Sequence, residues 1–318
     1  MSFNKKATRR EFLVAGSTAA LAAATAAASA TANPSGSEAA VVPEIEAARF
    51  TSEGLLESAP QRTFSGDKAT QISMPLGGIG AGSICLNGYG GLQDFSIHAR
   101  PETSALPSVW TSNSPEAAFA VLHIKGEAGV TKLVEGPFPA FKIFDQGLQG
   151  QGLRRGGFEG FPRFGKCIFK GEYPFGEVQL SDSNVPLEVK LTGWNPFIPL
   201  DDKSSGIPCV ILEYTLRNSS PRPVEYEFSY HLSHLAPGCK GEQQTSANTV
   251  IPGKGVFLHN TEEPNSEAFG SASLTVIGDS PRDKLRIKGM WLRSPEWTYG
   301  SLTAMWREVS TGSYTVNE

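Results

Sequence analysis

The sequence contains few cysteines and no cysteine motif. Its four cysteines, Cys85, Cys167, Cys209 and Cys239, lie far apart among 318 residues, and no C-x-x-C pair is present. This spacing argues against a zinc site built from cysteine. Two alternatives stay open for these thiols. Export would allow one or two disulfides, whereas Cys209, at the start of an apolar segment, is equally consistent with a buried free thiol.

Runs of basic residues are missing after the first 32 residues, and so are long apolar runs. The whole chain has a net charge of −4, with 28 basic and 32 acidic residues. Residues 1–32 hold four of the basic residues and one of the acidic ones, so the remainder has a net charge of −7. We therefore expect neither nucleic acid nor an anionic lipid surface as a partner, and no stable membrane insertion.

The first 32 residues have the composition of an export signal. A basic region holds the pair Arg9-Arg10, and a weakly apolar, alanine-rich run follows it to about residue 30. We interpret this segment as a twin-arginine signal peptide that directs export to the periplasm or the extracellular space. A retained membrane anchor is the alternative, although alanine is a poor substitute for leucine in a bilayer. The small residues at the two candidate cleavage sites are Ala28, Ala30 and Ala32.

Long amphipathic helical patterns are also scarce. Residues 33–62 are polar and rich in Ala, Ser and Glu, which predicts a flexible linker. From residue 63 to residue 318, glycine and proline separate short apolar or alternating runs. Many short strands with frequent turns predict an all-β domain, a large antiparallel β-sandwich, preceded by the signal peptide. One short helix is expected near the C-terminus, where the residues that share a face are Leu302, Met305, Trp306 and Val309.

Two segments alternate clearly between apolar and polar residues. In 208–218 the apolar positions are Val210, Leu212, Tyr214 and Leu216, and in 224–232 they are Val224, Tyr226, Phe228, Tyr230 and Leu232. Period-2 patterning predicts strands with one buried face. The polar residues between the apolar ones, such as Glu227 and His231, are expected on the solvent face. Because Asn218-Ser219-Ser220-Pro221 supplies turn residues, we expect the two strands to pair as an antiparallel hairpin.

Several motifs together resemble the N-terminal domain of glycoside hydrolase family 116, which includes the non-lysosomal glucosylceramidases. The resemblance covers about residues 63–312. The motifs are the glycine-rich segment Ile72–Ser83, Tyr173-Pro174-Phe175, Trp194–Leu200 with Glu213–Asn218 after it, and the weaker Met305–Glu308 followed by Gly312.

The resemblance implies a β-sandwich that packs against a C-terminal (α/α) barrel, which carries the chemistry. Family members hydrolyse β-glucosidic bonds with retention, using a carboxylate nucleophile and a carboxylic acid/base that both lie in the barrel. We therefore assign no catalytic residue, metal ligand or cofactor site in this chain. It is expected to be inactive alone, to be truncated at its C-terminal end relative to the family's domain, and to brace a barrel supplied in cis or in trans, with β-glucosides as candidate ligands where the two domains meet.

A free-standing carbohydrate-binding or interaction module is the alternative. In that case exposed tryptophans would stack on sugar rings. The candidates are Trp110, Trp194, Trp291, Trp297 and Trp306.

Three other patterns are better explained by structure than by chemistry. The run Gly77–Gly82 has no G-K-[ST] sequence and predicts a tight turn, which either is purely structural or faces the catalytic domain. His231 and His234 fall on opposite faces of a strand, which disfavours a shared metal ion. The acidic pairs Asp201-Asp202, Glu225/Glu227 and Glu262-Glu263 are expected on the solvated surface.

Overall fold

The computed structural model describes residues 62–97, 118–126, 129–137, 160–236, 238–240, 243–278, 285–291 and 297–314. All of them belong to one compact unit, residues 59–318. The segments predicted to be signal peptide and linker therefore lie outside the described residues, apart from residue 62.

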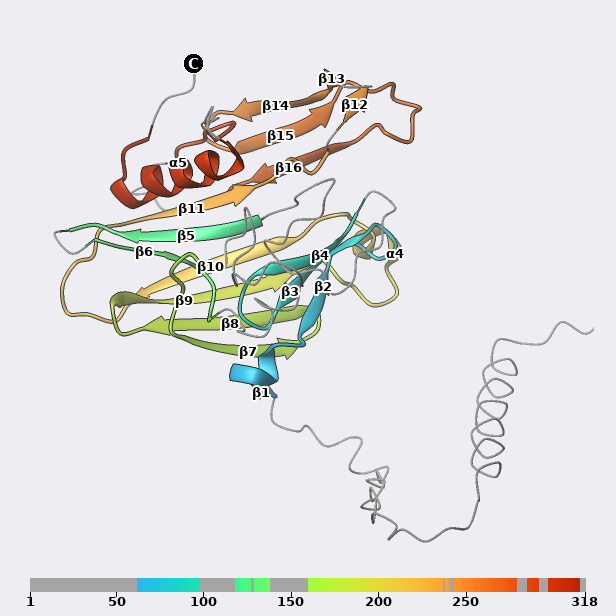
Figure 1. The fold of residues 1–318 in the computed structure, drawn as a ribbon. Helices are drawn as coiled ribbons and strands as arrows, with labels where there is room; N and C mark the ends of the chain where they lie inside the picture. The colour runs from blue at the N-terminus through green and yellow to red at the C-terminus, as the bar shows by residue number, and fades with distance from the viewer. Residues whose placement is uncertain are drawn as a thin grey trace, which may run out of the picture. The chain divides into compact units, whose positions relative to one another are not determined.

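Antiparallel strands make up most of the regular secondary structure in the described residues, as the sequence predicts for an all-β protein (Figure 1). The largest sheet has the order β1-β7-β8-β9-β10, and a second sheet has the order β11-β5-β6. The strands of the first are β1 (Thr63–Phe64), β7 (Lys166–Glu172), β8 (Phe175–Asp182), β9 (Val185–Trp194) and β10 (Ile211–Asn218). Those of the second are β5 (Ala118–Ile124), β6 (Val130–Leu133) and β11 (Tyr226–Leu232).

Three smaller sheets are also present in the described part of the chain. One contains β2 (Ser73–Leu76), β3 (Ser83–Asn87) and β4 (Leu92–Ser96). Another contains β14 (Ser246–Ile251), β15 (Gly255–Asn260) and β16 (Ser271–Thr275), and β12 (Cys239–Lys240) pairs with β13 (Gln243–Gln244). The helices among the described residues are the 3-10 turn η1 (Gly66–Ala69), the single-turn α4 (Asp202–Ser205) and α5 (Trp297–Thr311).

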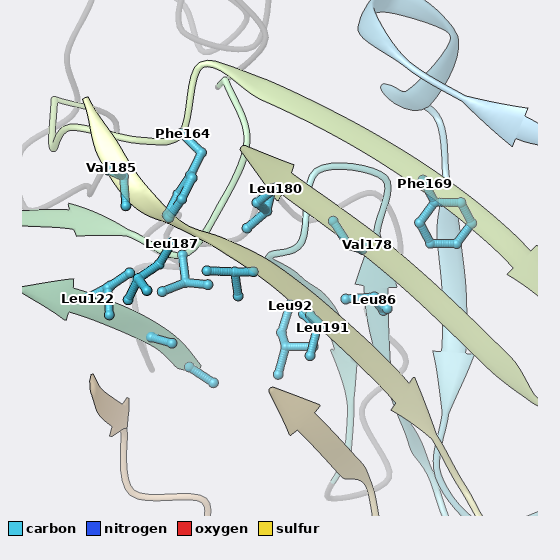
Figure 2. Close-up of a cluster of buried hydrophobic side chains, with 14 of the residues drawn as sticks. Leu86, Leu92, Leu122, Phe164, Phe169, Val178, Leu180, Val185, Leu187 and Leu191 are labelled. Carbon is cyan, nitrogen blue, oxygen red and sulfur yellow. The ribbon is translucent and has the colours of Figure 1, made fainter. Parts of the chain in front are cut away.

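The main core lies between the five-stranded sheet and the sheet that contains β5. Strand β9 has one buried face because its apolar residues occupy alternate positions. Val185, Leu187, Val189 and Leu191 alternate with more exposed residues and are all at least 94% buried. Figure 2 shows Val185, Leu187 and Leu191 with Leu122 of β5 and Phe164. Each fully buried aliphatic side chain contributes about 1.5–3 kcal/mol relative to an exposed one.

The predicted hairpin between the segments 208–218 and 224–232 is wrong. Strand β10 pairs with β9, and β11 pairs with β5, so the two strands belong to different sheets. They meet instead through their apolar faces: the rings of Tyr214 and Phe228 lie 4.7 Å apart, between the sheets. The alternation identified the core-facing sides correctly except at Tyr226, which is 41% exposed. It could not specify the pairing, because the link after Asn218 is long enough to cross from one sheet to the other.

A second apolar cluster covers the opposite face of β5, where helix α5 packs (Figure 1). Phe119 and Val121 of β5 contact Met305 and Val309, which confirms the predicted helix and two of its four apolar positions, with Trp306 packed against the cluster. The side chain of Leu302 lies outside the described residues. In the part of the chain that the structure describes, no helix is both long and apolar enough to cross a membrane.

Residues 285–291 and the segment that follows helix α5 contact the polar face of β11, which the sequence predicted to face solvent. Tyr314 donates a hydrogen bond to Glu227 (2.9 Å), and Trp291 donates one to His231 (3.1 Å). Strand β11 is therefore covered on both faces rather than one.

Candidate interaction surface

The glycine-rich segment Gly77–Gly82 forms the turn between β2 and β3. Gly77, Gly80 and Gly82 have φ angles of 138°, 75° and 89°, which side chains disfavour. A Cβ atom on Gly77 would also lie 2.5 Å from the carbonyl oxygen of Gly82. These constraints agree with the prediction that the glycines are needed for a tight turn.

This turn lies against the segment that follows β9. A Cβ atom on Gly78 would approach the carbonyl oxygens of Gly206 and Ile207 to 2.5 Å, so only glycine allows this contact. The N–H of Ile79 donates to the carbonyl oxygen of Ser205 (2.8 Å). The buried Ser205 hydroxyl in turn accepts from the N–H of Ile198 (2.9 Å) and donates to its carbonyl oxygen (3.0 Å). The fold therefore brings two distant sequence motifs into direct contact.

Leu200 is the most unusual residue of this region. Its side chain is fully exposed, and its φ angle of 69° is costly for a residue with a Cβ atom, by about 1–2 kcal/mol. The next residue fixes the conformation: the Asp201 side chain caps α4 by accepting from the N–H (3.0 Å) and the hydroxyl (2.7 Å) of Ser204. These bonds hold the pKa of Asp201 below its usual value. A strained and exposed leucine beside a capped helix is typical of a functional position.

Aromatic residues of the segments 173–175 and 194–200 lie together at one end of the large sheet. The pairing register joins Phe175 of β8 to Trp194 of β9, and their ring centroids are 5.9 Å apart. Tyr173, in the turn before β8, contacts Phe197 edge-to-face at 5.2 Å. The segments 173–175 and 194–200 are thus neighbours.

We call the exposed apolar residues of these segments the apolar end surface. Each of its side chains is at least 47% exposed, and the contacts described above bring their segments together. Exposed apolar side chains gathered in this way are commoner at interaction sites than single ones. Nothing in it suits acid–base chemistry, because the adjoining Asp201 is committed to its cap. Such a patch can bury area against a partner. Its members are Ile79, Tyr173, Phe175, Ile198, Leu200 and Ile207.

The sequence analysis missed these six residues as a site. A signal was present, because large apolar residues stood in glycine- and proline-rich turn segments where polar residues are usual. These residues are far apart in the sequence, and it is the pairing of β7, β8 and β9 that brings their segments together.

The residues predicted to act in export, Arg9 and Arg10, and those of the cleavage sites, Ala28, Ala30 and Ala32, lie outside the described residues.

His231 bonds to Trp291 and Ser229, whereas His234 bonds to the backbone of Ala247 and Ala236. Among the described residues, no group of three His, Cys, Asp or Glu side chains could hold a metal ion. Cys85, Cys167 and Cys209 are free thiols, and the side chain of Cys239 is not described.

The acidic pairs are not arranged as a catalytic pair. Asp201 caps α4, Glu227 forms an ion pair with Lys125 (2.7 Å), and Glu262 accepts from the hydroxyl of Thr245 (2.8 Å). Glu225 is exposed as predicted, whereas Glu227 is partly buried.

The tryptophans whose side chains are described lie in packed clusters. Trp306 stacks on Phe161 at 4.5 Å, Trp291 contacts Phe119, and Trp194 contacts Phe175. None of these three is an exposed platform for sugar. Trp110 and the side chain of Trp297 lie outside the described residues.

Comparison with known families identifies a family for this chain. The family model described as "beta-glucosidase 2, glycosyl-hydrolase family 116 N-term" matches residues 73–317, which include the glycine turn and all three segments of the apolar end surface. No curated protein matches the chain. Because the match extends over most of the sequence, the chain belongs to the family of glycosyl-hydrolase family 116 N-terminal domains.

Proposed function

We propose that this chain is the non-catalytic N-terminal β-sandwich domain of an exported β-glucosidase- or glucosylceramidase-like glycoside hydrolase. Its role is to pack against an (α/α)-barrel catalytic domain, in cis or in trans, and to brace the cleft in which a β-glucoside is hydrolysed. Export follows the twin-arginine route, a proposal that rests on Arg9 and Arg10.

The apolar end surface carries this proposal. Five of its six residues, all except Ile207, belong to motifs that resemble the family. The glycine turn and the cap on α4 hold its backbone in place before any partner binds, and a preorganised surface loses little entropy on association. An apolar patch of this kind is typical of a protein interface rather than of an active site.

The proposal can be tested by mixing the purified chain with a separately expressed catalytic domain of family 116. We expect a complex in analytical ultracentrifugation. Leu200→Asp should weaken it by about a hundredfold, because a charge at the centre of an apolar interface remains desolvated and unpaired.

Ile277→Asp is a suitable control, because Ile277 is 89% exposed and follows β16, away from the apolar end surface. This variant should bind like the wild type. Equal binding by the wild type and by Leu200→Asp would refute docking through this surface. A chain that forms no complex and remains a soluble monomer would favour a free-standing module.

A further inference from the structure

Strand β4 of the small sheet β2-β3-β4 contains a bulge at Asp94. Between the pairs Ser83–Ser96 and Cys85–Gln93, β4 has one residue more than β3, so two residues of β4 oppose one of β3. Asp94 takes the left-handed conformation there, with a φ angle of 53°. Glycine is usual at such a position because side chains disfavour it, so an aspartate in this place indicates a use for its carboxylate.

The bulge directs two consecutive side chains to the same face of the sheet. The core residues of β4, Leu92 and Phe95, are three positions apart rather than two, and Gln93 and Asp94 lie between them. Nε2 of Gln93 donates a hydrogen bond to Oδ2 of Asp94 (3.0 Å), and the hydroxyl of Ser73 in β2 donates to the same oxygen (2.5 Å). A regular strand would send these neighbours to opposite faces, so the sequence pattern gives no sign of the site.

The carboxylate of Asp94 is buried without a cationic partner. The residue is only 6% exposed, and the two groups that donate to it are neutral. None of the ion pairs in the described part of the chain includes Asp94. Its second oxygen, Oδ1, is buried and has no hydrogen-bond partner among the described residues. A buried carboxylate is costly unless it pairs with a cation or coordinates a metal ion.

Gln93 adds a second unpartnered oxygen. The residue is 5% exposed, and the bond from its Nε2 to Asp94 fixes the orientation of the amide. Its Oε1 is buried and accepts no hydrogen bond from the described residues. A water molecule could donate to these oxygens, but it would leave the charge of Asp94 uncompensated. A small cation satisfies both requirements.

The neighbouring thiol favours a hard cation over a soft one. Cys85 pairs with Gln93 across the sheet. Burial raises the pKa of the Cys85 thiol, and the charge of Asp94 adds to this effect, so the thiol stays protonated and is a poor metal ligand. Oxygen ligands without a thiolate suit magnesium or calcium rather than zinc. Calcium tolerates irregular coordination, whereas magnesium demands a nearly ideal octahedron, so an irregular strand favours calcium.

We propose that the bulge at Gln93 and Asp94 binds a calcium ion. Oδ1 of Asp94 supplies the charged ligand and Oε1 of Gln93 a neutral one, with water molecules completing the coordination. Ser73 beside the carboxylate is exposed, which gives the ion a route from solvent. Because only one ligand is charged, we expect a Kd of about 10⁻⁴–10⁻³ M, as in extracellular calcium modules. The proposal does not depend on the apolar end surface, because the two sites share no residue.

The test combines isothermal titration calorimetry of the full chain with melting temperatures in EDTA, calcium or magnesium. We expect the wild type to bind one calcium ion and to melt at a higher temperature in calcium, with a smaller effect of magnesium. Asp94→Asn preserves the shape of the side chain but removes its charge, so it should lose calcium binding. In EDTA this variant should melt at or above the temperature of the wild type, because it no longer buries an uncompensated charge.

Gln93→Glu tests the site by a gain of binding. A second carboxylate should strengthen calcium binding about tenfold, because the charge of the ligands tunes the affinity of such sites. The same variant should melt at a lower temperature in EDTA, since two carboxylates then repel each other, and calcium should restore the loss.

Asp182→Asn is the matched control. The Asp182 side chain is 7% exposed, but it already has a cation, because it forms an ion pair with Lys132. This variant should be less stable than the wild type and should still bind calcium.

Three results would each overturn the proposal: no binding of calcium by the wild type, an equal effect of magnesium, or an unchanged response to calcium in Asp94→Asn. A wild type that ignores calcium but is less stable than Asp94→Asn in EDTA would show a carboxylate that is merely hydrated or protonated. If Asp94→Asn does not fold, Gln93→Glu decides, and a lack of gain in its calcium affinity would reject the site.

Discussion

The indole N–H of Trp291 donates a hydrogen bond to Nδ1 of His231 across 3.1 Å. Because an indole can only donate, Nδ1 must be the unprotonated nitrogen, and Nε2 carries the hydrogen toward the hydroxyl of Ser229, 3.0 Å away. The ring of Phe119 stacks on the same imidazole at 4.9 Å. The neutral form of His231 therefore links β11 to residues 285–291 and to the apolar cluster under α5.

This arrangement predicts a stability that depends on pH. Burial lowers the pKa of His231 to about 4, against an opposing effect of Glu308. Between pH 6.5 and pH 4 the unfolded chain binds a proton that the folded chain does not, so the free energy of unfolding should fall as the pH falls through this window. The loss should reach about 2–3 kcal/mol at pH 4. Urea melts at several pH values would measure it.

His231→Gln serves as the comparison, because glutamine can still accept from Trp291 but does not titrate. Carboxylates with lowered pKa values, such as Glu227, also lose stability in acid, and they do so equally in both proteins. The difference between the two slopes thus isolates His231. Parallel curves from pH 6.5 to pH 4 would contradict the prediction.

The burial of one face of β10 predicts unequal effects of two neighbouring substitutions. Tyr214 packs against Phe228 and Tyr230 between the sheets, whereas Thr215 is exposed. Tyr214→Asp should reduce the free energy of unfolding by about 3–5 kcal/mol, because it places a charge in the core. Thr215→Asp should cost less than about 1 kcal/mol. Equal losses in urea melts would show that both faces of β10 are buried.

The ion pair of Arg163 and Glu135 should be essential to stability. Their side chains are 5% and 7% exposed, and Nε of Arg163 lies 3.1 Å from a carboxylate oxygen of Glu135. Arg163→Met should cost about 3–5 kcal/mol, because it leaves the Glu135 carboxylate buried without its cation. Thermal melts of the double variant Arg163→Met/Glu135→Gln should recover part of this loss.

A second arginine–glutamate pair provides a built-in control. Arg217 and Glu188 are 80% and 52% exposed. Arg217→Met should change the free energy of unfolding by less than about 0.5 kcal/mol. Similar losses from Arg163→Met and Arg217→Met would mean that burial does not determine the strength of these pairs.

The export proposal predicts a strict requirement for the arginine pair. Replacing Arg9-Arg10 with Lys-Lys should hold the precursor in the cytoplasm, as seen by cell fractionation, whereas the wild type should be exported with a new N-terminus near Thr31 or Asn33. Continued export of the variant through the general secretory route would reject the twin-arginine assignment while leaving a signal peptide in place.

The sequence by itself determined which residues lie on the same face of each strand or helix. In β10, Leu212, Tyr214 and Leu216 pack on the core as their period-2 spacing predicted, and Met305 and Val309 of α5 do so at helical spacing. The glycines of the turn 77–82 were recognised for the same reason. All these properties follow from backbone geometry within a few residues, so a local pattern contains them.

Only the tertiary structure decided which strands pair and which surfaces remain exposed. The partner of β10 is β9 rather than β11, and the polar face of β11 is covered by residues more than fifty positions away, such as Trp291. The apolar end surface likewise joins Ile79 to Ile198 and Tyr173. An alternating strand has two faces and two edges, and its own residues state only which face is apolar. What covers the other face, and what pairs with each edge, depends on the free energy of packing distant segments together, which no local pattern records.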